Sequence, residues 1–195
     1  MYPWDIAKQV GTHFERNWKE RQAERDGACD RLLRAIGDDA VPPKARMSLA
    51  MRVARRMLER TERHKREQRP ARDLDAILAE REAGRPLPDD LLAQARQHLF
   101  EAEGSVKTWE AWGEGCELES ARRERALLAV AVALGDATDG WKTVVPAALE
   151  HAGLCEWFEV YRQALRDAGA LADHVGYMRE AATILLDLFA VIAAR

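Results

Sequence analysis

The sequence predicts an all-α protein, a single domain over residues 1–195 built as an irregular bundle of about seven or eight helices. Three observations support this prediction. Apolar residues recur every three or four positions along most of the chain, no segment alternates with the period of two typical of strands, and no β-branched run is bounded by turn residues. Composition and charge change only weakly near residues 100–105. We therefore expect one domain over the whole sequence rather than two domains that meet at this point.

The first third of the chain predicts two or three helices. An amphipathic helix begins near Pro3 and either continues through Asp26-Gly27 or breaks there. Its apolar face ends at Gly37, a residue suited to a left-handed helix end. A loop over 37–43 leads into a proline-started helix, whose apolar residues from Met47 to Thr61 share less than half of the helix circumference.

Glycines divide the rest of the chain into shorter predicted helices. These are a short helix from Asp73 to Gly84, one from about 91 to Gly104, one over about 117–134, a short one near Pro146 ending by Gly153, one over 154–168 and one over about 171–194. The last two and the second half of 117–134 are the most apolar, so we expect them at the centre of the bundle. The run 181–194 is shorter than the ~20 residues that span a bilayer, which predicts a core helix and no membrane segment.

Residues 43–72 form the strongest charge feature, with eleven Lys and Arg against three Glu. Five arginines lie opposite the apolar arc of this helix: Arg52, Arg55, Arg56, Arg63 and Arg66. The apolar pattern stops after Thr61, because polar residues occupy the next positions on that face. We therefore expect the helix to leave the body of the protein near Thr61 and to end as a basic projection, broken by Pro70.

This basic segment has three interpretations. With Arg69, the five arginines are candidates for binding phosphates of nucleic acid, where counterion release supplies affinity without sequence preference. The same set would suit an acidic protein partner, since guanidinium groups bind carboxylates in pairs of hydrogen bonds. The third interpretation is a solvated helix face with ion pairs to the Glu-rich segment 101–119, each worth ~0–1 kcal/mol. Few aromatic residues interleave with the arginines, which disfavours single-strand binding.

Trp109 and Trp112 are the second candidate binding feature. They lie three residues apart, beside the glycines of the sequence Trp-Gly-Glu-Gly (112–115). Tryptophan at helical spacing usually belongs to a core, yet the surrounding glutamates leave little apolar sequence to bury this pair. If the two rings are exposed, they mark a protein-binding site, because tryptophan is a preferred interface anchor.

No motif predicts catalysis, a cofactor or a metal. The five histidines lack metal-binding spacing, His98 and Glu101 suggest only a surface pair, and glycine-rich phosphate loops are missing. Asp187 is the one charge within the apolar run, on a narrow stripe with Glu180 and Thr183 that we expect to reach water or a polar neighbour. Three scattered cysteines and an N-terminus without a secretory pattern predict a reducing, cytoplasmic location.

Together these observations predict a non-enzymatic protein-interaction module, an adaptor or an inhibitor or immunity-type protein that binds a partner protein through charged surfaces. The first 100 residues carry net charge +4 and the remainder −7, which gives the chain two oppositely charged regions. The alternative is a helical nucleic-acid-binding subunit that lays the basic 44–72 helix along a phosphate backbone. We expect neither cofactor nor metal in either case.

Overall fold

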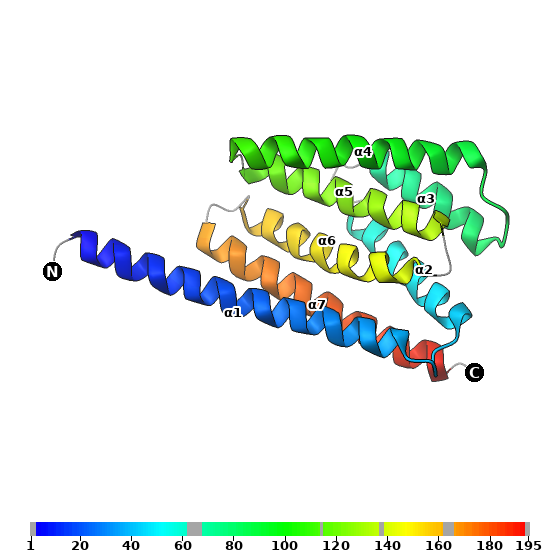
Figure 1. Ribbon diagram of the computed structural model, residues 1–195, viewed down its shortest axis with the longest axis horizontal. Helices are drawn as coiled ribbons and strands as arrows, with labels where there is room; N and C mark the ends of the chain where they lie inside the picture. The colour runs from blue at the N-terminus through cyan, green and yellow to red at the C-terminus, as the bar shows by residue number, and fades with distance from the viewer. Residues whose placement is uncertain (1–2, 62–67, 114, 137–138, 162–165, 194–195) are drawn as a thin grey trace.

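The computed structural model describes residues 3–61, 68–113, 115–136, 139–161 and 166–193, with side chains within 19–61, 68–113, 117–135, 139–156 and 173–193. In these ranges the chain forms seven α-helices and no strand (Figure 1). They are α1 (Pro3–Gly37), α2 (Pro43–Thr61), α3 (Gln68–Glu82), α4 (Asp89–Trp112), α5 (Gly115–Asp136), α6 (Trp141–Tyr161) and α7 (Arg166–Ala193). The predicted all-α bundle of about seven helices is confirmed.

Helix α6 lies in the middle of the bundle. It packs against α5 on one side and against α7 on the other, and these are among the most extensive helix contacts in the structure (Figure 1). Helix α4 covers α5 from outside, while the long α1 runs beside α7 along the opposite edge (Figure 1). Helix α2 contacts α3, α6 and α7, so the basic segment begins inside the bundle rather than beside it.

The core follows the apolar patterns of α2, α5 and α6. The predicted arc of α2 is buried, with Val53, Ala54 and Met57 fully inaccessible to solvent. The second half of α5 is buried from Ala126 to Leu134 apart from two partly exposed positions, as its uninterrupted apolar sequence predicts. Among the described residues, no helix has both the length and the apolarity needed to cross a bilayer.

Several glycines predicted to end helices lie inside them instead. Helix α4 continues through Gly104 to Trp112, and α6 continues through Gly153 to Tyr161. A glycine costs a helix only about 1 kcal/mol, which tertiary packing readily offsets. The left-handed glycines that follow a helix are Gly84 (φ 65°), as predicted, and Gly113 (φ 70°), whereas Gly37 keeps helical backbone at the end of α1.

The structure also decides two further boundaries. One of them, the predicted helix end at residue 168, is wrong; the other, the break at Asp26-Gly27, was only one of two alternatives that the sequence left open, and the structure selects continuation, since α1 runs to Gly37. The predicted helix 154–168 does not exist as a unit: its first half belongs to α6, residues 162–165 lie outside the described ranges, and Gly169 lies within α7.

Candidate functional site

The basic segment 43–72 is not one projecting helix. Helix α2 ends at Thr61, whose side chain is buried and donates a hydrogen bond to the Met57 carbonyl oxygen at 2.8 Å. Pro70, predicted to break the helix, is the third residue of α3 and is buried. Arg63 and Arg66 lie outside the described residues. For the described part of the segment, the prediction of a basic projection is wrong, because the chain turns back onto the bundle as α3.

Arg56 and Arg60 point from α2 towards the polar stripe of α7. The Nη2 and Nε atoms of Arg56 donate hydrogen bonds to Glu180 Oε1 at 2.9 and 3.2 Å, and Arg60 donates to the other oxygen of the same carboxylate. Arg56 also pairs with Asp187, and Arg52 lies 4.0 Å from that carboxylate. The Glu180 side chain is 0% exposed. The predicted stripe on α7 therefore does reach a polar neighbour, and the neighbour is the basic face of α2.

Arg55 and Arg69 are paired on more exposed parts of the surface. Arg55 donates hydrogen bonds to Asp75 at 3.0 Å and to Glu82 at 2.6 Å, and the hydrogen bond to Glu82 raises the pKa of the guanidinium. Arg69 donates to Glu101 at 2.7 Å. Ion pairs to the 101–119 segment were one of the three interpretations of the basic segment, and among the described candidates Arg69 makes such a pair, to Glu101. The carboxylates of α3 and α7 are the main partners.

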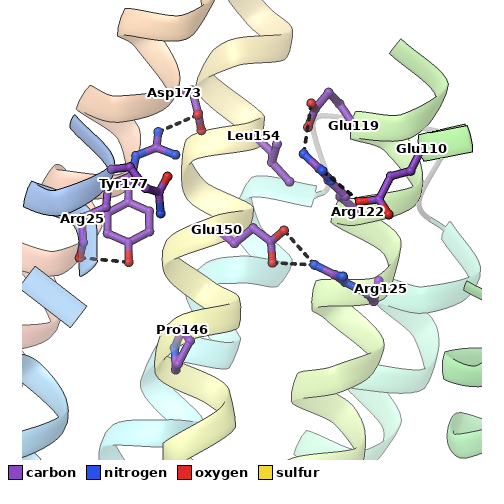
Figure 2. Close-up of a pocket in the computed structure, with 11 residues that line it drawn as sticks. Arg25, Glu110, Glu119, Arg122, Arg125, Pro146, Glu150, Leu154, Asp173 and Tyr177 are labelled. Carbon is purple, nitrogen blue, oxygen red and sulfur yellow. Dashed lines mark hydrogen bonds and ion pairs between the residues drawn. The ribbon is translucent and has the colours of Figure 1, made fainter. Parts of the chain in front are cut away.

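A polar cavity of about 520 Å³ lies over α6, between the α1–α7 pair and the α4–α5 pair (Figure 2). Four ion pairs line it: Arg25–Asp173 at 2.5 Å, Arg122–Glu110 at 3.0 Å, Arg122–Glu119 at 3.5 Å and Arg125–Glu150 at 2.8 Å. Sequence reasoning missed this cavity, because its residues come from five helices and form no local motif. The polar start of α5, which supplies Arg122 and Arg125, was the one visible signal.

The cavity contains paired charges and no activated nucleophile among its described residues. Each of its arginines contacts a carboxylate, so the attraction for a charged ligand is largely cancelled within the protein. Burial raises the pKa of the Glu119 carboxyl, and burial likewise raises the pKa of the Tyr177 hydroxyl, which donates a hydrogen bond to the Arg25 carbonyl oxygen at 3.3 Å. The arrangement is a polar cavity in which arginine and carboxylate side chains neutralise one another in pairs.

The described histidines contact side chains of the same chain. His98 contacts Asp73 of α3 at 2.5 Å and not the predicted Glu101. His151 and Cys155 lie one turn apart on α6 with Nδ1 and Sγ 3.8 Å apart, but both are buried, so a substrate has no access to this pair. No group of three His, Cys, Asp or Glu side chains in the described ranges is arranged to hold a metal ion.

Trp112 is exposed at the end of α4. Its side chain is 73% accessible and stacks edge-to-face with the partly buried Trp109, with ring centroids 6.1 Å apart and an interplanar angle of 76°. Gly113 follows in the left-handed conformation and donates its N–H to the Trp109 carbonyl oxygen at 3.0 Å, which ends the helix immediately beyond the pair. The structure thus places both predicted tryptophans together, with one of them facing solvent.

Other large apolar side chains are exposed, most of them on α7, which the sequence predicted at the centre of the bundle. Leu186 and Phe189 of α7 are 69% and 61% accessible, and Leu185 is also exposed. Phe100 on α4 is 72% accessible. Helix α7 was predicted to lie at the centre, but only one of its faces, with Ala181, Ile184 and Leu188, reaches the core. The opposite face is apolar and uncovered, a feature that a pattern of apolar residues alone cannot distinguish from burial.

No protein-family model, curated protein sequence or solved structure matches this chain.

Proposed function

We propose that this chain is a protein-interaction module, an adaptor or inhibitor, that binds a partner protein through the aromatic end of α4. The observation that carries the proposal is the exposure of Trp112 beside Trp109. Tryptophan supplies a large apolar surface at a small cost in side-chain entropy and is enriched among residues that dominate binding energy. The edge-to-face contact with Trp109 holds the exposed ring in place before a partner arrives.

The partner that fits this site has an apolar pocket with a basic rim. Exposed acidic side chains flank the tryptophans in the sequence: Glu117 lies in the first turn of α5, and Glu110, on the same helix as the tryptophans, keeps an exposed carboxylate although it also pairs with Arg122 at 3.0 Å. Opposite charges around an interface raise the rate of association and select between partners more than they add affinity. This differs from the sequence prediction that charged surfaces themselves bind the partner, since most of the described arginines are already paired within the chain.

The nucleic-acid alternative gains no supporting observation. Arg55, Arg56, Arg60 and Arg69 each contact a carboxylate of the same chain, so phosphates would have to displace partners that are already in place. Arg63 and Arg66 lie outside the described residues, and their role stays a prediction. The predicted absence of enzymatic activity and the cytoplasmic location stay predictions as well.

The test is site-specific capture followed by a direct binding measurement. A photo-crosslinking phenylalanine analogue placed at Ala111, the exposed neighbour of Trp112, should capture a distinct protein when living cells are irradiated, and the same analogue at Phe100 should not. Phe100 is a matched control, because it is equally exposed and lies on the same helix, twelve residues or about 18 Å from Trp112.

The captured protein is then purified and titrated against variants of this chain. The Trp112→Ala substitution should weaken binding by ~30-fold or more, the effect expected of a dominant interface residue, and Trp109→Ala with Trp112→Ala should abolish it. The Phe100→Ala variant should bind as the wild type does. Equal affinities for the Trp112→Ala and Phe100→Ala variants would refute the proposed site.

A further inference from the structure

The uncovered face of α7 is an apolar seam with regular spacing. Ala182, Leu186, Phe189 and Ala193 are all exposed, and they follow one another at intervals of four, three and four residues. Leu185 and Ala190, also exposed, flank the two larger residues. Alternation of three and four is the spacing with which one helix packs along another in a coiled coil.

The seam contains no charged residue. Asp187 and Glu180 point away from it towards the arginines of α2. The six exposed side chains present on the order of 500 Å² of apolar surface, which is the size of the largest patch found on a typical monomer and often marks an interaction site. The seam is also remote in sequence from the α4 tryptophans, so a contact there is separate from the proposed function.

We infer that the occupant of this seam is a second copy of the same chain, with the two α7 helices packed antiparallel about a twofold axis. The order small, large, large, small and the spacings four, three, four read the same from either end. Such a surface is complementary to itself, which a twofold interface requires. In this register Leu186 packs against the partner's Phe189, and Ala182 faces the partner's Ala193.

The charge at the start of the seam selects the antiparallel orientation. Arg179 lies one turn before Ala182; it forms a surface ion pair with Glu156 at 2.8 Å, and its side chain is still 62% exposed, so the guanidinium remains accessible to a second chain. In the antiparallel pair it lies near the C-terminal end of the partner's α7, where the helix dipole favours a cation. In a parallel pair the two Arg179 side chains would face each other and repel.

The surface area buried between the two copies limits the affinity of the dimer. Two copies bury roughly 1,000 Å² in total, which is close to the lower limit for a specific interface. The dimer should therefore be weak, with a dissociation constant of about 1–100 µM, and the fraction of dimer should rise with protein concentration over this range.

Sedimentation equilibrium from about 1 to 500 µM tests the dimer. The wild-type mass should rise from 22.0 kDa towards twice that value. The Leu186→Asp/Phe189→Asp variant should stay monomeric, with dimerisation weakened by ~100-fold or more because each carboxylate would be buried without a partner. The Phe100→Asp variant changes an equally exposed aromatic residue outside the seam and should dimerise as the wild type does. A wild-type chain that is monomeric throughout, or a double variant that still dimerises, would overturn the inference.

A second measurement tests the register without disturbing the seam centre. Chains carrying Ala182→Cys and chains carrying Ala193→Cys should form a disulfide-linked heterodimer on mild oxidation when mixed. Chains carrying Ala182→Cys alone should not link, since the two copies of this position lie ~16 Å apart along the antiparallel pair. Wild type oxidised in parallel controls for the native cysteines. Self-linkage of Ala182→Cys that equals or exceeds the mixed product would overturn the antiparallel arrangement.

Discussion

Removing the two arginines that contact Glu180 should destabilise the protein far more than removing Glu180 itself. The carboxylate is fully buried, whereas the side chains of Arg56 and Arg60 are 21% and 28% exposed. The double substitution Arg56→Met/Arg60→Met keeps the apolar stems that pack on α2 but leaves Glu180 inside the protein without either cation that contacts it. The converse substitution, Glu180→Met, leaves two guanidinium groups that can turn towards water.

The difference follows from the cost of an unpaired buried charge. Breaking a buried ion pair by removing one partner costs about 3–5 kcal/mol, so the double arginine variant should lose that amount. The Glu180→Met variant should lose about 1–2 kcal/mol, because Arg56 retains Asp187 and only hydrogen bonds to partly solvated groups are lost. Replacing all three residues by methionine should restore the protein to within ~2 kcal/mol of wild type, since an apolar cluster of similar volume substitutes well for a buried ion pair.

Urea titration followed by far-ultraviolet circular dichroism measures these free energies of unfolding, and thermal melts provide a second scale. For a chain of this length 1 kcal/mol corresponds to ~2–4 °C, so the double arginine variant should melt about 10 °C below wild type. A Glu180→Met variant that is less stable than the double arginine variant would refute the reasoning. So would a triple variant that is no more stable than the double.

Three further predictions concern single side chains. Arg55→Ala should cost at most about 1 kcal/mol in urea titrations, and less at high salt, because its two ion pairs are exposed; a cost of 3 kcal/mol would contradict this. Gly153→Ala should lower the free energy of unfolding by about 1–3 kcal/mol, since the added Cβ would lie 2.8 Å from the Asp173 backbone oxygen. Gly104→Ala has open space around it and should raise the free energy of unfolding by about 0.5–1 kcal/mol. Effects of the same sign in the two variants would contradict the packing argument. Burial raises the pKa of Glu119 in the folded state, so this carboxyl contributes stability that is present below its unfolded pKa and lost as pH rises through the folded value. The stability of wild type relative to Glu119→Gln, measured from about pH 4 to pH 7, should therefore fall as pH rises, and a constant difference would show that the carboxyl titrates as in the unfolded chain.

The sequence was sufficient to predict α2 and its buried face, but not the partners of its arginines. The apolar arc from Met47 to Thr61 follows from helical spacing alone. The carboxylates that pair with Arg56 lie more than 120 residues away, on α7, and local spacing carries no information about which helices become neighbours. The signal was nevertheless present, because Glu180 and Asp187 form an acidic stripe on one helix and the arginines form a basic stripe on another. Matching stripes of opposite charge between helices would have suggested the contact.

Helix ends were harder to predict than helices. Glycine is a residue type that often ends helices, yet Gly153 and Gly176 lie inside α6 and α7. Because they lack a side chain, the two helices approach so closely that a Cβ at Gly176 would lie 2.7 Å from the Ala152 backbone oxygen. A glycine that ends a helix and a glycine that brings two helices together look alike in a sequence. Only the second kind has a neighbour across the interface, and that neighbour is set by the fold. The same limit applied to the polar cavity over α6, whose residues come from five helices.

Where a partner can bind depends on which charged side chains are already paired within the protein and which apolar side chains are exposed. Ion pairs within the chain satisfy Arg55, Arg56 and Arg60, so the excess of basic residues in the segment 43–72 overstates the charge available to another molecule. Exposed apolar side chains have no comparable partner within the described chain. Trp112 and the seam around Leu186 remain in water, where each carries a cost that only a contact with another surface removes. Binding by this protein should therefore depend on its tryptophans and its outer α7 face more than on its arginines.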